Sequence, residues 1–149
     1  MPTDLQVGDE LPSVTRTMTR DWIMRHDLAL LSCRVDQRLG EKDVVNIHTS
    51  QEFARRNALP APVPDGMVTG NWISSLMLLH FGHAYARGGT LDVKFIKPTF
   101  EGDELTVRAR LAERVAESGA TRLRFDVWCE RPEGQVVTTG DASVLLTHD

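Results

Sequence analysis

The chain has 149 residues, a formal net charge of −4 at neutral pH, 41% hydrophobic residues and 26% charged residues. This balance is ordinary for a globular protein and predicts one domain, residues 1–149, with a core of its own. The absence of any block of like charge argues against nucleic acid or an anionic membrane as the main partner. Cys33 and Cys129 lie far apart without metal-type spacing, which favours reduced core thiols in a cytoplasmic protein.

The first half of the chain predicts two helices separated by a loop. Thr19 is a suitable N-cap, because apolar residues recur at helical spacing directly after it. Residues 34–42 lose this periodicity and are predicted to form a loop. A short helix is expected over residues 50–57, with Phe53 and Ala54 facing inward.

A long apolar segment follows a turn with proline at every second position from Pro60 to Pro64, which excludes regular helix there. We expect one long helix to start at Gly66 and to end at Gly88 and Gly89, where a left-handed C-cap is available. A helix that is apolar on most sides is usually buried. Its expected inward residues are Met67, Trp72, Ile73, Leu76, Met77, Leu79, Phe81 and Tyr85.

The remainder of the chain predicts strands, because apolar and polar residues alternate between turn signals. The expected strands are residues 91–95, 105–111, 123–129 and 136–147. No helix separates them, so antiparallel pairing is expected, with the long helix covering the apolar face. An antiparallel sheet curled around one long helix is the hotdog fold, of the α+β class. Open edge strands favour pairing with a second chain, so we expect a homodimer through sheet edges, or a heterodimer with a homologous subunit.

Candidate chemistry centres on Asp43 and His48, an acid and an imidazole five positions apart and shortly before the long helix. The start of that helix at Gly66 offers backbone N–H groups and a positive dipole end to a developing oxyanion. These groups are a minimum set for chemistry beside a carbonyl. His80 and His83 share a helical face, but no third ligand accompanies them, so packing is favoured over a metal site.

Several blocks of the sequence resemble the MaoC-like, (R)-specific enoyl-CoA hydratase family. That family has a loop of the form D-x-N-P-x-H, a short acidic-aromatic helix, and H-G-M at the start of the hotdog helix. The corresponding residues here are 43–48 (DVVNIH), 51–54 (QEFA) and 64–67 (PDGM). Residues 93–105 resemble the strand–turn–strand that closes over the acyl chain. The sequence departs from the family at Asn46, which replaces the proline, and at Asp65, which replaces the histidine.

The resemblance implies reversible syn addition of water to a 2-enoyl thioester of CoA or of an acyl carrier protein, without a cofactor. It implies that Asp43 and His48 hold the water and move the proton, with the base not assigned between them. The Gly66 N–H would bind the thioester oxygen. Asp65 would cap the helix beside this oxyanion site, and Asn71 is a weaker candidate near the substrate.

Two other interpretations remain open. A thioesterase uses the same fold with a differently placed carboxylate. A non-catalytic or half-catalytic subunit of a heterodimeric hydratase would also explain the departures at Asn46 and Asp65. On the predicted strands, Arg108, Arg110, Arg122 and Arg124 face away from the core, so most of them are expected to be solvated.

Overall fold

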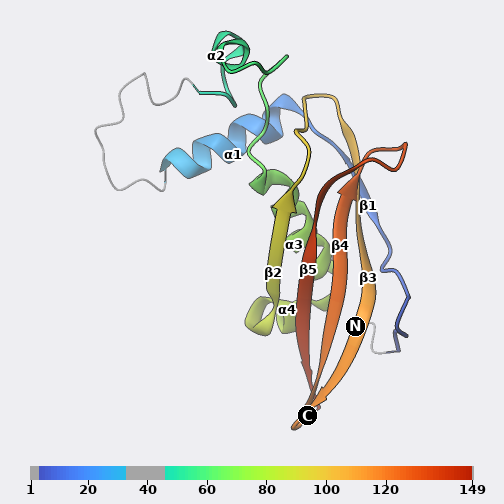
Figure 1. The fold of residues 1–149 in the computed structure, drawn as a ribbon. Helices are drawn as coiled ribbons and strands as arrows, with labels where there is room; N and C mark the ends of the chain where they lie inside the picture. Colours follow the sequence, from blue (N-terminus) through green and yellow to red (C-terminus); the bar gives the residue numbers. More distant parts are fainter. Residues whose placement is uncertain (1–3, 33–45, 149) are drawn as a thin grey trace. The chain divides into compact units, whose positions relative to one another are not determined.

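The computed structural model describes residues 4–32 and 46–148 (Figure 1). It divides into two compact units, and the prediction of a single domain stays a prediction. The first, which we call the sheet unit, comprises Met1–Arg16, Thr69–Lys97 and Leu105–Asp149. The second, which we call the loop unit, comprises Thr17–Val68 and Pro98–Glu104.

A five-stranded sheet in the order β1-β3-β4-β5-β2 forms the framework of the sheet unit. The ladders β3–β4, β4–β5 and β5–β2 are antiparallel, as the sequence predicted. The strands are β1 (Val14–Thr17), β2 (Thr90–Phe95), β3 (Glu104–Glu117), β4 (Ala120–Glu130) and β5 (Val136–Thr147). In the part of the chain that the structure describes, β2 has a paired neighbour only on its β5 side.

Alternation along the strands separates a core face from a charged face. Leu123, Phe125, Val127 and Cys129 of β4 are buried, and burial raises the pKa of the Cys129 thiol to about 12. On the opposite face, Arg108 pairs with Glu130, and neighbouring strand arginines pair with other glutamates. The arginines predicted to be solvated are therefore held in surface ion pairs.

Helix α3 (Met67–Phe81) covers the core face of the sheet within the sheet unit (Figure 1). The Phe81 and Phe125 rings lie 5.4 Å apart between centroids, and the hydroxyl oxygens of Thr69 and Thr138 lie 2.8 Å apart in a buried hydrogen bond. The prediction of one helix through to Gly88 is wrong, because the helix is interrupted at Gly82. This residue has a φ of +49°, and a separate helix, α4 (His83–Gly88), begins after it.

Two of the residues expected to face inward from the long helix are exposed. Met67 is 46% exposed and Leu79 is 69% exposed, whereas Trp72, Ile73, Leu76, Met77, Phe81 and Tyr85 are buried. A helix with apolar residues on every side does not reveal from its sequence which side is covered. The open side of α3 in the sheet unit therefore carries apolar surface that the pattern assigned to the core.

The loop unit contains α1 (Arg20–Ser32) and α2 (Gln51–Arg56). The predicted Thr19 cap is confirmed, since the Trp22 N–H donates to the Thr19 hydroxyl. The sequence allows Thr49 or Ser50 to cap α2, and the structure has Ser50, whose hydroxyl accepts from the Phe53 N–H. Ala54 is buried as expected, but Phe53 is 39% exposed, so its inward assignment is wrong. Every helix that the structure describes is too short or too polar to span a bilayer.

Candidate functional site

His48 occupies the turn that leads into α2 in the loop unit and is half-buried. Its Nδ1 lies 2.6 Å from the carbonyl oxygen of Val63, and the Val63 N–H donates to the carbonyl of Ile47 at 3.1 Å. A carbonyl oxygen only accepts, so Nδ1 carries the proton in this hydrogen bond. In the neutral imidazole, Nε2 therefore holds the lone pair, which is the form of histidine that accepts a proton.

Asn46 builds the turn that presents this imidazole. Its side-chain oxygen accepts from the backbone N–H of His48 at 2.7 Å and from that of Thr49 at 3.2 Å. The Asn46 N–H in turn donates to the Thr49 hydroxyl at 3.2 Å. Such side-chain-to-backbone bonds are characteristic of asparagine turns. Asn46 is thus a structural anchor of the loop at the position where the family motif has proline.

A pocket of about 200 Å³ adjoins His48 within the loop unit. Apolar residues of α1 and of two surrounding loops form one part of its wall, and polar side chains form the remainder. Its residues are Arg20, Ile23, Met24, His48, Thr49, Gln51, Ala61, Pro62, Phe100 and Glu101. A pocket with both apolar and polar lining residues suits a substrate that combines an apolar chain with one polar reacting group.

Asp65 caps the beginning of α3, the role that the sequence allowed for it. Its Oδ1 accepts from the N–H of Met67 at 2.8 Å, and its carbonyl accepts from the N–H of Val68 at 3.0 Å. A carboxylate in this place complements the positive end of the helix dipole. Asp65 and the adjacent Gly66 are both half-buried and lie in the same unit as His48.

Of the other two predicted site residues, the structure describes only Asn71, and it does not bring this residue into the unit of His48, Asp65 and Gly66. Asp43 lies outside the described residues, as does Cys33. Asn71 belongs to the sheet unit, where it is exposed and its carbonyl accepts from the Ser75 hydroxyl at 2.8 Å. The catalytic pair and the contribution of Asn71 therefore stay predictions.

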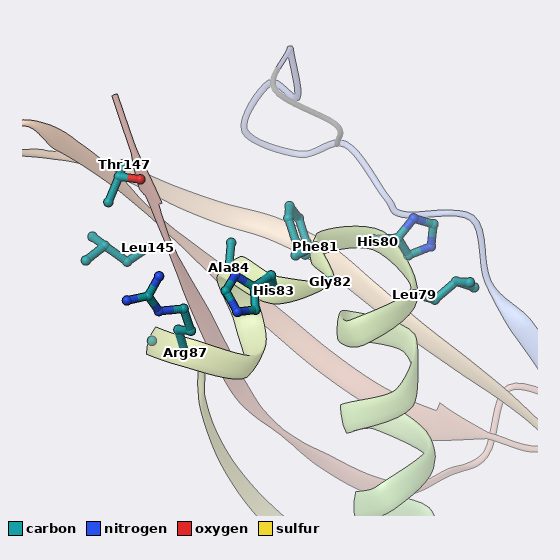
Figure 2. A pocket seen from close by; sticks show the side chains of 10 residues that line it. Leu79, His80, Phe81, Gly82, His83, Ala84, Arg87, Leu145 and Thr147 are labelled. Atoms are coloured by element: carbon teal, nitrogen blue, oxygen red, sulfur yellow. The ribbon is translucent and has the colours of Figure 1, made fainter. Parts of the chain in front are cut away.

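The two histidines considered as metal ligands point apart at the end of α3 (Figure 2). His80 Nε2 donates to the carbonyl of Pro12 at 3.1 Å, whereas exposed His83 starts the separate helix α4 and lies toward Arg87. Both line a pocket of about 870 Å³ in the sheet unit. The described residues contain no group of three His, Cys, Asp or Glu side chains placed to hold a metal ion.

Sequence reasoning missed two contributors to this site. Asn46 was regarded only as a departure from the family motif, although an asparagine two residues before a histidine is a recognisable turn signal. Asp27 of α1 was not singled out, yet it is buried and its Oδ1 accepts from the side-chain amide of Asn46 at 3.3 Å. The two residues are 19 positions apart, so no local pattern connects them.

The fold of the chain is similar to that of several solved structures. The R-hydratase PhaJ1 from Pseudomonas aeruginosa aligns with a TM-score of 0.72 and 17% identity, over 98% of this chain and 84% of that one. The (R)-hydratase from A. caviae involved in PHA biosynthesis gives 0.69 and 19%, over 95% and 97% of the two chains. The ChsH1-ChsH2 complex from Mycobacterium tuberculosis gives 0.68 and 14%, over 95% and 97%. At these identities the likeness shows the fold alone.

No curated protein sequence matches the chain. The model of the MaoC like domain matches residues 37–126, which is more than half of the sequence. This match spans the turn with His48, the start of α3 and most of β2 to β4. Together with the antiparallel sheet and its helix, it shows that the chain belongs to the MaoC-like dehydratase family and has the α+β hotdog fold.

Proposed function

We propose that this chain is an (R)-specific hydratase that adds water reversibly to a 2-enoyl thioester and gives the 3-hydroxyacyl thioester. The observation that carries the proposal is the hydrogen bond from His48 Nδ1 to the carbonyl of Val63, which leaves Nε2 as a proton acceptor beside a pocket. Membership of the MaoC-like dehydratase family supports the same reaction.

In the proposed reaction, Asp43 and His48 hold a water molecule between them. One of the pair removes a proton as the water oxygen bonds to the β-carbon, and the electron pair of the double bond moves onto the thioester oxygen. The pair then gives a proton to the α-carbon on the same face, which returns the pair to its starting protonation, and the electron pair on oxygen re-forms the thioester carbonyl. General acid–base assistance of this kind contributes roughly 10²–10⁴-fold to a rate.

We propose that the thioester oxygen lies against Gly66 at the beginning of α3. Glycine has no side chain to keep the substrate away, and the dipole of a helix favours negative charge at its N-terminus. The Asp65 carboxylate is already engaged by the Met67 N–H, so we assign it a capping role beside this oxygen. Asn71 is retained as a substrate contact on the family resemblance alone.

The test is a panel of 2-enoyl-CoA substrates of varied length and branching, followed by loss of the enoyl absorbance. We expect hydration by the purified chain and its loss in Asp43→Asn and His48→Asn, with both variants folded. A folded protein that hydrates no substrate, on CoA or on an acyl carrier protein, would refute the assignment. Release of free CoA without loss of the enoyl group would instead support a thioesterase.

A second candidate function is that of one subunit in a heteromeric hydratase. The observations that favour it are the aspartate at position 65 and the asparagine at position 46, where the family motif has histidine and proline. One structural neighbour is a complex of two named chains, ChsH1 and ChsH2. Inactivity of the chain alone, with activity restored by a co-purifying MaoC-like partner, would support this role.

We further propose that a second copy pairs with the open edge of β2. The N–H of Ile96 donates to Val137 of β5, so the even-numbered residues of β2 direct their backbone groups toward β5. Backbone groups alternate in direction along a strand, and those of Leu91, Val93 and Phe95 therefore point to the open side. These groups are available to a partner strand.

Charge selects the register of this pairing. An antiparallel two-fold pair centred on Val93 places Asp92 opposite the partner's Lys94, twice in the dimer. Centring the pair on Asp92 or on Lys94 would instead oppose like charges. The same register brings Phe95, which is 47% exposed, against the partner's Leu91. We therefore propose a homodimer whose two-fold axis passes beside Val93.

A further inference from the structure

Asp27 connects helix α1 to the turn that carries His48. Its side chain is 5% exposed, and its Oδ1 accepts from the Nδ2 group of Asn46 at 3.3 Å. Asn46 uses the other end of its amide to accept from the backbone N–H groups of His48 and Thr49. One side chain thus bridges a buried carboxylate and the backbone of the candidate base.

The chemistry of the two ends fixes which way the Asn46 amide points. Asp27 Oδ1 accepts from the Asn46 Nδ2 group, so the NH₂ end of the amide faces Asp27. The amide oxygen then faces the backbone N–H of His48 at 2.7 Å. A flipped amide would oppose two oxygens at one end and two donors at the other. Asp27 therefore enforces the orientation that the turn requires.

The backbone turn, once held in this way, fixes the position of the imidazole. With its backbone N–H held by Asn46, His48 places Nδ1 on the carbonyl of Val63 at 2.6 Å. The N–H of Val63 donates to the carbonyl of Ile47 at 3.1 Å, so Val63 is hydrogen-bonded both to the His48 ring and to the residue before His48. The direction of the Nε2 lone pair is then set by a chain of contacts that begins at Asp27.

We propose that Asp27 and Asn46 are positioning residues that set the tautomer and direction of His48. Their hydrogen bonds reach His48 through the backbone of the turn. The inference rests on the proposed function for its kinetic consequence, but its structural consequence is independent of any activity. Burying a polar side chain carries a desolvation cost, and fixing the amide orientation is a use for this buried carboxyl group.

The test exchanges the two side chains. Asn46→Asp alone places two carboxylates face to face and should break the contact. The double variant Asp27→Asn, Asn46→Asp restores one donor facing one acceptor and leaves a carboxylate to accept from the turn. We expect the single variant to lose roughly 10- to 100-fold in kcat with KM within about twofold, as small misplacements of reacting groups do. The double variant should recover to within roughly threefold of the wild type.

Nitrogen NMR of the His48 ring supplies a readout that does not depend on activity. We expect the Nδ1-protonated tautomer in the wild type and in the double variant, and a mixture of tautomers in Asn46→Asp. Asn57→Ala is the matched control, because among the described residues the Asn57 side chain donates to the carbonyl of Phe53, within α2 and its C-cap. It should leave both the ring signals and kcat unchanged.

The outcomes separate the two proposals. An Asn46→Asp variant with wild-type ring signals and wild-type kcat would overturn the positioning role, as would a double variant that fails to recover either quantity while remaining folded. If the wild type hydrates no enoyl thioester but the tautomer follows the exchange as described, the positioning role is supported and the hydratase proposal fails.

Discussion

The Nδ1 of His48 and the carbonyl oxygen of Val63 form a 2.6 Å hydrogen bond that ties the turn before α2 to the chain just before α3. The partner is a backbone oxygen, so substitution of a side chain at position 63 does not remove it. The bond serves the fold and the proposed reaction at once, because it holds the turn and defines the free nitrogen of the ring. Two substitutions of His48 separate these roles.

His48→Asn keeps an amide donor near the position of Nδ1 and removes Nε2. We expect it to lose about 10²–10⁴-fold in kcat, because the proton acceptor is gone. Its melting temperature should stay close to that of the wild type. His48→Gln places its amide farther out, near the position of Nε2, and loses the bond to Val63, so it should be both inactive and less stable. Hydration assays and thermal unfolding of the two variants make the comparison.

An active His48→Asn variant would show that Nε2 takes no part in the reaction. Equal melting temperatures for the Asn and Gln variants would show that the bond to Val63 contributes little to stability. Each result addresses one role of the bond and leaves the other standing.

The proposed dimer predicts a charge-reversal pattern at the β2 edge. Asp92→Lys should weaken dimerisation at least tenfold, because it opposes lysines twice across the two-fold axis, and about 1.4 kcal/mol corresponds to a factor of ten. Asp92→Lys with Lys94→Asp should restore the wild-type dissociation constant. Sedimentation equilibrium at low salt measures the dimer dissociation constant of the wild type, the single variant and the double variant.

Val93→Cys provides an independent check of the register. A cysteine beside the axis meets its own copy, so we expect an oxidised, covalent dimer to form readily at this position. Leu91→Cys lies away from the axis and serves as the matched control. Efficient cross-linking of Leu91→Cys instead of Val93→Cys, or a wild type that sediments as a monomer, would exclude this register.

A tight backbone crossing at Gly140 predicts a specific loss of stability. A Cβ at this position would lie 2.0 Å from the carbonyl oxygen of Asp92 and 2.8 Å from the Cα of Val93. Both are backbone atoms of β2, so no change of side-chain rotamer can relieve the clash. Gly140→Ala should cost roughly 1–3 kcal/mol of unfolding free energy, as overpacking of a core does.

Gly88→Ala is the control for this substitution. A Cβ there would meet only the Cβ of Leu145 at 3.7 Å, which is an ordinary contact, and Gly88 is the last residue of α4. We expect a neutral or slightly stabilising effect. Urea unfolding of both variants tests the contrast, and similar free energies for the two would contradict the close approach at Gly140.

The elements that could be predicted from the sequence are those with a local physical signal. Alternating side chains placed the last four strands, and hydroxyl caps located the starts of α1 and α2. The break at Gly82 could not be predicted, because the apolar run continues through it and a single glycine within a helical pattern is compatible with a continuous helix. The exposure of Leu79 was missed because its helix is apolar on every side.

The candidate site was predictable in part for the same reason. Capping by Asp65 was predicted from its place before a helix, whereas the turn at Asn46 was missed although asparagine has a local turn signal. The role of the Val63 carbonyl is a backbone contact across 15 positions, and the contact of Asp27 with Asn46 spans 19. Such pairings depend on the tertiary fold and leave no trace in local pattern.

The ion pairs of Glu10 predict that the stability of the sheet unit depends on pH. Its carboxylate is hydrogen-bonded by Arg110 and lies near Arg108, and these contacts hold the pKa of Glu10 below its ordinary value of 4.5. The folded state therefore favours the ionised carboxylate, which is a stabilising contribution above the unfolded pKa. That contribution is lost as the pH falls below 4.5 and through the lowered folded value. Glu10→Gln should thus differ most from the wild type near neutral pH and converge with it in acid.

Urea unfolding between about pH 3.5 and 7 measures this convergence. Glu133→Gln is the control, because exposed Glu133 forms no ion pair with any described residue. Its difference from the wild type should stay small across the range. The ion pair of Glu10 with Arg110 links the segment before β1 to β3. The N–H of Leu11 donates to the carbonyl of Ala109 at 2.9 Å in the same place. A Glu10→Gln difference that is independent of pH would mean that the two arginines do not lower the pKa of this carboxyl in solution.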